Sequence, residues 1–445
     1  MVFSSAWGGA SAGNYNSLLV ARVFQGVGLA PYEALVNASV GDLFFVHERG
    51  KRMALSNVAL FGGSFFTPVI VGKLTVSMGW EWTFNFLAIF SAACLPLIIF
   101  CAPETAFRRA AHLNTDFEGE SRQGVGPNIT AAAAPTNTTQ PIDLDAENNN
   151  RSSSQKSREE ETKAEKQDSR DEDASGHDPG NTEEAARDVI PRKVTYWQSL
   201  KPFNGRKTDE SYWKLLLRPL PLFLHPGILW ACLTQGILIG WTVFIGVVLA
   251  AIFSFPPLWF TEDKIGYLYT GAFIGSIAGL IISGLLADYS ARLLTKLNRG
   301  VYEPEFRIVL VVFQLVFSAL GLYGFGYTTA DVARYGYVVP DVFFAFVIVG
   351  MVMGAVASAL YVVDAHRQIA VEAFTCLLVF KNMFSFLLTY FAYDWIVRSN
   401  PKQVFIIIAS IQVGVCLLSI PMYIFGKINR SFFHRHDILK MLNLW

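Results

Sequence analysis

The sequence has little charge and few chemically reactive side chains, and both shortages exclude classes of function. Charged residues make up 16% of the 445, and the 36 basic residues balance the 36 acidic ones. A chain without net charge offers no bulk electrostatic attraction to nucleic acid. The five cysteines lie in or beside apolar runs without CxxC spacing, so neither a metal site nor a disulfide is indicated. We find no Ser/His/Asp arrangement and no phosphate-binding loop, and therefore expect neither an enzyme nor a bound cofactor.

The most abundant feature is a series of long apolar segments. Hydrophobic residues make up 52% of the chain, and the mean hydropathy is +0.35 although one long internal segment is almost wholly polar. An α-helix of about 20 apolar residues crosses the hydrocarbon core of a bilayer. Such segments cover residues 18–45, 53–76, 83–101, 227–253, 267–287, 308–325, 341–362, 370–393 and 404–425. The sequence therefore predicts an all-α polytopic membrane protein that lies in a lipid bilayer.

The polar segment divides the chain into parts. We expect helix bundles over residues 1–107 and 226–426, a disordered linker over 108–194 and a tail over 427–445. Residues 195–225 are expected to form a juxtamembrane amphipathic segment, although a simple leader into the next span explains them equally well. If the basic loop after the first apolar segment lies inside, twelve Lys and Arg residues gather on that side against four on the other. The positive-inside rule then predicts that the linker and the C-terminus are cytosolic.

Two motifs give this series of spans a family resemblance. The first lies within Leu18–Ala30 and reads LxxxRxxQGxGxA, with an arginine inside an apolar run and small residues after it. The second lies within residues 284–292 and reads GLLADYSAR. The two resemble, respectively, the fourth-helix motif of major facilitator superfamily transporters and the loop between their helices eight and nine.

This resemblance implies a major facilitator fold of six plus six helices. The chain has counterparts of the end of helix three, helices four to six and the second half, so we expect it to lack roughly the first two and a half helices. Pro103–Thr105 and Tyr302–Arg307 look most like the fungal drug:proton antiporter branch, with its multidrug- and polyamine-type members. The Thr67–Gly72 segment looks like a degraded form of the fifth-helix glycine-proline motif, because two of the motif's glycines are replaced.

Proton coupling needs a titratable group whose protonation differs between two states, and three charges inside predicted spans are candidates. Arg22 costs about 2.5–3.5 kcal/mol on insertion scales, so it either modulates a nearby carboxylate or bonds a neighbouring helix. Glu33 lies about three turns further on the same helix face; it either carries a proton, contacts a cationic substrate or bonds another helix. Lys381 either loses its proton on substrate binding or pairs with a carboxylate such as Glu33; the structural alternative is a lysine that bridges helices or reaches toward the interface. The polar neighbours expected in the same cavity are Gln25, Gln235 and Asn382, and for Gln235 core packing is the simpler interpretation.

Other residues are expected to serve the conformational change. The resemblance implies that charged residues at cytosolic helix ends latch one state of a rocking motion; a solvated charge cluster is the alternative. The predicted latch residues are Gly284, Asp288, Arg292, Asp42 and Arg49, and the predicted helix-packing residues are Gly26, Gly28, Pro68 and Gly72. Histidines at the cytosolic ends, His366 among them, are expected to be solvated or to face lipid headgroups.

These observations favour a secondary active transporter that exports small organic compounds, cations among them, in exchange for protons by alternating access. We expect a monomer in the plasma membrane that binds a small-molecule substrate and protons but no nucleic acid. Two alternatives stay open. One is a uniporter or importer of the same fold, which the direction of flux would separate. The other is a non-transporting membrane protein, truncated or regulatory, which substrate-dependent proton flux would exclude.

Overall fold

Helices are the only regular elements in the part of the chain that the structure describes. This computed structural model describes residues 1–11, 13–43, 52, 55–56, 58–101, 211–366, 369–436 and 441–442. Within these ranges, eight helical segments are long and apolar enough to cross a membrane. They are Ala59–Met78, Glu81–Phe100, Pro226–Phe253, Glu262–Leu297, Pro304–Thr329, Val338–Ala365, Ala370–Arg398 and Pro401–Phe433. The predicted all-α polytopic class is confirmed.

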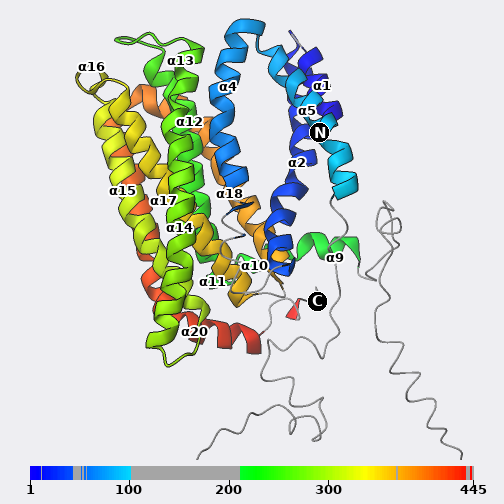
Figure 1. The fold of residues 1–445 in the computed structure, drawn as a ribbon, viewed down its shortest axis with the longest axis vertical. Helices are drawn as coiled ribbons and strands as arrows, with labels where there is room; N and C mark the ends of the chain where they lie inside the picture. The colour runs from blue at the N-terminus through cyan, green and yellow to red at the C-terminus, as the bar shows by residue number, and fades with distance from the viewer. Residues whose placement is uncertain are drawn as a thin grey trace, which may run out of the picture. The chain divides into compact units, whose positions relative to one another are not determined.

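Four longer helices form the N-terminal part (Figure 1). They are α1 (Val2–Ala10), α2 (Tyr15–Leu43), α4 (Gly63–Met78) and α5 (Glu81–Cys101), with a π-helical turn, η1 (Val58–Gly62), before α4. With 29 residues α2 has the length of a span, but its polar residues keep it below the hydropathy of the eight others. It also contains Pro31, which membrane helices tolerate because neighbouring groups satisfy the freed carbonyl.

The C-terminal part consists of six spans and several short helices. The spans are α11–η3–α12 (Pro226–Ala231, Cys232–Ile237, Leu238–Phe253), α13–α14 (Glu262–Tyr267, Tyr269–Leu297), η4–α15 (Pro304–Val309, Leu310–Thr329), α17 (Val338–Ala365), α18 (Ala370–Arg398) and α19–α20 (Pro401–Leu417, Ser419–Arg435). Short helices α9 (Tyr212–Leu217), α10 (Pro219–Leu222) and α16 (Val332–Tyr335) lie between or before them. Several helices run beyond the predicted apolar segments, because a helix continues into the headgroup region after its apolar stretch ends.

Helix α17 is packed between α14 and α15 (Figure 1). Small residues make both contacts close. A Cβ at Gly275 of α14 would lie 2.5 Å from the Ala345 carbonyl oxygen, and a Cβ at Gly350 of α17 would lie 2.9 Å from the Ser318 nitrogen of α15. Lipid tails are as apolar as leucine, so helices in a membrane associate through such close backbone contacts.

The outer face of α15 shows the polarity expected in lipid. Val312 and Val316, one turn apart, are 58% and 57% exposed. The opposite face carries Gln314 and Ser318, both fully buried against neighbouring helices. A water-soluble helix would have its polar side chains outside, so this reversed arrangement matches an apolar solvent.

Candidate functional site

An ion pair joins α2 to α18 within the lengths that would lie in the membrane. The Lys381 ammonium donates a hydrogen bond to Glu33 Oε1. Both side chains are mostly buried, with 13% of Lys381 and 21% of Glu33 exposed. Two buried charges depend on each other, because neither has enough water to replace its partner. Protonation of Glu33 therefore weakens this contact between α2 and α18.

Aromatic neighbours on α18 fix the direction of Lys381. Phe380 and Phe384 lie one turn apart, and their rings stack with centroids 6.0 Å apart. A Cβ at Gly236 or Gly240 would overlap these rings, so both rings fill gaps that the glycines leave on the first span of the C-terminal part. Successive residues of a helix are rotated by about 100°, and Lys381 therefore leaves α18 on a different face, toward α2.

Arg22 has other partners than the carboxylate expected for it. Its Nη1 donates to Gln25 Oε1 at 3.2 Å, and Gln25 Nε2 donates to Ser5 Oγ of α1 at 3.1 Å. The guanidinium carbon lies 4.4 Å from the centre of the Phe84 ring of α5, a cation–π contact. Among the described residues no carboxylate pairs with Arg22, and Glu33 pairs with Lys381 instead. The geometry thus corresponds to the structural alternative, in which Arg22 connects α2 to α1 and α5.

The remaining polar candidates, Gln235 and Asn382, make no hydrogen bond to the ion pair among the described residues. Gln235 Oε1 accepts from Ser358 Oγ of α17 at 3.0 Å, inside the C-terminal part. It lies in the π-helical turn η3, where the Thr234 carbonyl accepts from Gln314 Nε2 at 2.9 Å. Wide turns of this kind occur often at functional sites because they free backbone groups. The Asn382 side chain is exposed, and in the described part of the chain it forms no hydrogen bond with Glu33 or Lys381.

A close glycine crossing joins α4 to α13. A Cβ at Gly266 would lie 2.7 Å from the Pro68 carbonyl oxygen, and a Cβ at Gly72 would lie 3.0 Å from the Glu262 carbonyl oxygen. The two backbones are in contact here, which is possible only without side chains at both glycines. Pro68 and Gly72, predicted as packing residues, therefore lie at a contact between the N-terminal and C-terminal parts.

The small residues of α2 are placed differently. Among the described residues, no atom beyond the neighbouring turns of α2 lies within 4 Å of the position of a Cβ at Gly26. At Gly28 the nearest atom is the Met1 nitrogen, 3.0 Å away. Among the described residues, another segment packs against Gly28 but not against Gly26.

Part of the predicted latch can be located. Asp288 and Arg292 lie on the last turns of α14, and no ion pair joins them in the described structure. The Asp288 Oδ2 atom is buried there without a hydrogen-bond partner, while Arg292 is exposed. Gly284 precedes them on the same helix. The Asp42 side chain and the whole of Arg49 lie outside the described residues.

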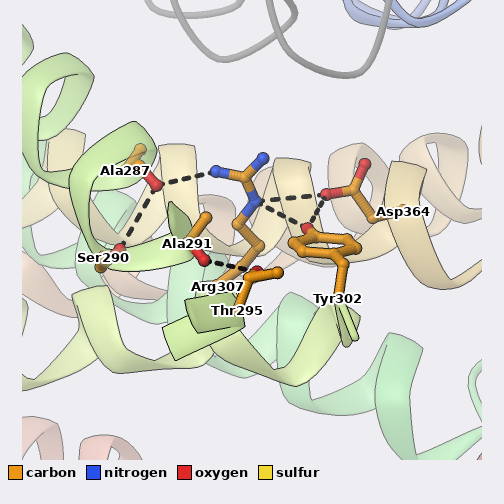
Figure 2. A network of polar contacts seen from close by, with 7 residues as sticks. All are labelled: Ala287, Ser290, Ala291, Thr295, Tyr302, Arg307 and Asp364. Carbon is orange, nitrogen blue, oxygen red and sulfur yellow. Dashed lines mark hydrogen bonds and ion pairs between the residues drawn. The ribbon is translucent and has the colours of Figure 1, made fainter. Parts of the chain in front are cut away.

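A polar network next to Asp288 was not predicted from the sequence (Figure 2). Arg307 Nε lies 3.2 Å from Asp364 Oδ2, and its Nη1 donates to the Ala287 carbonyl at 2.9 Å. The Tyr302 hydroxyl donates to the same Asp364 oxygen at 2.6 Å. The two charged side chains are 4% and 3% exposed. Burial, together with the Asp364 carboxylate, raises the pKa of Tyr302, so its hydroxyl stays protonated and connects the ends of α14, α15 and α17.

Two further ion pairs connect η4 and the loop before it to α20. Arg430 binds Glu305 with two hydrogen bonds of 2.9 Å, and Glu305 is almost fully buried. Lys427 donates to Glu303 at 2.8 Å, and this hydrogen bond lowers the pKa of Glu303. The Lys427 side chain is 73% exposed, so this second pair contributes little to stability.

A histidine pair lies at the same end of the C-terminal part, where solvated histidines were expected. The His225 and His366 rings meet edge to face with centroids 4.4 Å apart, and Phe433 of α20 covers His225 at the same distance. His225 Nδ1 and His366 Nε2 are buried without hydrogen-bond partners. Burial lowers the pKa of His225 to about 4, and burial together with His225 and Arg430 lowers that of His366 to about 3.

The histidine pair predicts a loss of stability in mild acid. An unfolded histidine takes up its proton near pH 6.5, whereas folded His225 does so near pH 4. The pair therefore costs nothing above pH 6.5, and its cost grows as the pH falls toward 4, reaching about 3 kcal/mol for His225 alone. We expect the melting temperature of the detergent-solubilised protein to fall over this range, and to fall less in His225→Phe. The same substitution at the exposed His436 is the control, and an equal change there would contradict the assignment.

Comparisons with known proteins agree with this architecture. The Major Facilitator Superfamily profile matches residues 1–369. Protein HOL1 of Saccharomyces cerevisiae is 23% identical over 433 residues, which cover 96% of this chain and 73% of that protein. An uncharacterized MFS-type transporter of Schizosaccharomyces pombe is 25% identical over 427 residues, 91% of this chain and 67% of that protein.

A third relative matches a shorter stretch. The MFS antiporter QDR3 of Candida albicans is 37% identical over 101 residues, 23% of this chain and 14% of that protein. The predicted resemblance to fungal members of the family is confirmed by these relatives. The family and the relatives named as transporters indicate a transporter of small molecules, not an enzyme. The chain is an integral, multi-pass membrane protein and belongs to the major facilitator superfamily.

Proposed function

We propose that the protein exports small organic compounds, organic cations among them, in exchange for protons. The observation that carries this proposal is the Glu33–Lys381 ion pair. It connects a helix of the N-terminal part to a helix of the C-terminal part, and one of its members is a carboxylate that a proton can neutralise. A titratable contact of this kind is what proton-coupled alternating access requires.

The coupling follows from the chemistry of the pair. While Glu33 is ionised, its attraction to Lys381 holds α2 against α18. A proton on Glu33 cancels that attraction and leaves Lys381 with an unpaired charge in a poorly hydrated site, which favours separation of the helices. A cationic substrate competes with both the proton and Lys381 for the same carboxylate, so proton and substrate bind in alternation.

A second contact supports a rocking motion. The Gly72–Gly266 crossing joins the two parts through α4 and α13, away from the pair on α2 and α18. Contacts between glycines have no interlocking side chains to disengage, which suits a contact that forms and parts repeatedly. In the proposed cycle this crossing closes one end of the substrate path and opens in the other state.

We propose an orientation and a setting from the charge distribution. The end that carries Arg307, Lys427 and Arg430 faces the cytosol, and the end that carries the α4–α13 crossing faces outside. The linker and the C-terminus are then cytosolic, and we place the protein as a monomer in the plasma membrane.

Transport by inside-out vesicles tests the proposal. Full-length protein is reconstituted or expressed in vesicles with an acid interior, and uptake of ethidium and of radiolabelled spermidine is followed. A gradient of one pH unit supplies about 1.4 kcal/mol per proton, so exchange for one proton supports roughly tenfold accumulation. Accumulation of either probe that a protonophore abolishes is the expected result.

The other outcomes identify the alternatives. Equilibration without accumulation indicates a uniporter. Accumulation only in vesicles of the opposite orientation, with acid outside, indicates an importer. Absence of flux for both probes and absence of probe-dependent proton movement favour the non-transporting protein, which the sequence left open.

A further inference from the structure

A half-buried aspartate lies at the beginning of α17, far along the chain from the ion pair. Asp341 is in the first turn of this helix, and its Oδ2 accepts from the Gly271 backbone nitrogen of α14 at 3.2 Å. Its Oδ1 is buried without a hydrogen-bond partner in the described structure. A Cβ at Gly271 would lie 2.5 Å from that oxygen, so the absence of a side chain lets the carboxyl reach the α14 backbone.

Among the described residues, the crevice beside Asp341 is lined by no cationic side chain. The narrow crevice beside it is lined by Leu249, Phe253, Leu268, Phe325, Tyr337, Pro340 and Phe344, and it is too narrow to admit water. Tyr337 is the titratable group in this lining, and the nearby Tyr269 hydroxyl donates to the Gly246 carbonyl at 3.1 Å.

The charged residues of the neighbouring short helices have other contacts. Asp263 of α13 accepts from Thr261, and Lys264 lies over the Phe260 ring. Asp331 caps α16, and Arg334 lies over the Tyr335 ring. On α19, Lys402 lies over the Tyr327 ring. Among the described residues, none of these pairs with Asp341.

Asp341 is mechanically connected to the glycine crossing. Gly271 is the third residue of α14, and Leu268, which lines the crevice, directly follows α13. Gly266 on α13 is the residue that touches the Pro68 backbone of α4. A change in the Asp341–Gly271 contact therefore acts on the segment that makes the crossing.

We propose that Asp341 is a second proton-binding site, which binds a proton from outside and thereby favours the closed α4–α13 crossing. The inference rests on the alternating-access motion proposed above. The two proton sites have different roles. Glu33 exchanges its proton for substrate, whereas Asp341 makes the α4–α13 crossing sensitive to the pH outside.

The direction of the effect follows from burial. In the closed arrangement the charged carboxylate has one backbone donor on Oδ2, and its Oδ1 atom is shielded from solvent without a partner, a costly position for a carboxylate. Opening of the crossing admits water, which solvates the ionised form. The proton therefore binds more tightly to the closed state, and by linkage acid outside shifts the population toward closure.

Distance measurements test this directly. Spin labels at Ser77→Cys and Lys264→Cys, both exposed near the crossing, report its separation in the full-length protein with Cys94 and Cys101 replaced by Ala. We expect the ratio of closed to open populations to rise by about tenfold or more between pH 8 and pH 5. In Asp341→Asn, which mimics the protonated form, the closed population dominates at both pH values.

The controls separate this proposal from the transport proposal. Asp394→Asn, at an exposed aspartate of α18, keeps the wild-type response. Asp341→Ser also removes the carboxyl and must lose the pH response, which guards against an Asn variant that fails to fold. Glu33→Gln removes proton-driven flux but keeps the distance response. A wild type without a pH response, a response of opposite sign, or a wild-type response in both Asp341 variants overturns the inference. Absent flux with an intact response overturns only the transport proposal.

Discussion

Glu33→Gln is expected to abolish proton-driven accumulation while substrate exchange across the membrane continues. Glutamine has nearly the same volume and can still accept a hydrogen bond from Lys381, but it carries no proton between the two sides. The variant should therefore lose the roughly tenfold accumulation that one pH unit supports. Exchange of labelled for unlabelled probe at equal pH needs no proton, so we expect it to continue, but with a higher KM because the cationic probe loses the Glu33 carboxylate.

Matched variants make this result specific. Glu81→Gln removes an exposed acid from the first turn of α5 and should transport like the wild type. Lys381→Met alone leaves the mostly buried Glu33 carboxylate without its cation and should slow exchange, because an unpaired buried charge is costly. The double variant Glu33→Gln/Lys381→Met should exchange better than Lys381→Met. Full proton-driven accumulation in Glu33→Gln would show that the proton travels through another group.

The sequence identifies the candidate charges, but it does not determine which of them form the ion pair. Apolar segment lengths predict the spans, and charges inside a span are expensive enough to draw attention to Arg22, Glu33 and Lys381. Which of these charges meet depends on helix packing between residues 348 positions apart. Arg22 leaves the same helix face as Glu33, yet its contacts in space are Gln25 and the Phe84 ring.

The buried polar contacts at the ends of the spans also depend on helix packing between distant residues, so the sequence does not predict them. Arg307 and Asp364 are 57 positions apart, each at the end of a different apolar segment, where charged residues are ordinarily solvated. Only the meeting of α14, α15 and α17 shows that these two are buried together. His225 carries no local signal either, since nothing in its neighbourhood reveals that His366 lies against it.

The Arg307–Asp364 network predicts the largest loss of stability of any substitution considered for this chain. Asp364→Ala leaves the Arg307 guanidinium, 4% exposed, without its counter-charge and removes the acceptor of the Tyr302 hydroxyl. Breaking a buried pair from one side costs about 3–5 kcal/mol, because the remaining charge has no water to return to. We expect a strong drop in the melting temperature and in the yield of monodisperse protein.

A double variant separates the loss of the ion-pair attraction from the cost of leaving one buried charge without a partner. Replacing both partners in Arg307→Met/Asp364→Leu removes the buried charges together, and buried pairs exchanged for apolar residues are often neutral in stability. Its melting temperature should therefore exceed that of Asp364→Ala, although the Ala287 carbonyl and the Tyr302 hydroxyl lose partners. Lys427→Met, at a pair that is 73% exposed on the lysine side, should cost less than about 1 kcal/mol. If Asp364→Ala were as stable as Lys427→Met, the network would be hydrated in the membrane-embedded protein, and packing, not this ion pair, would hold α14, α15 and α17 together.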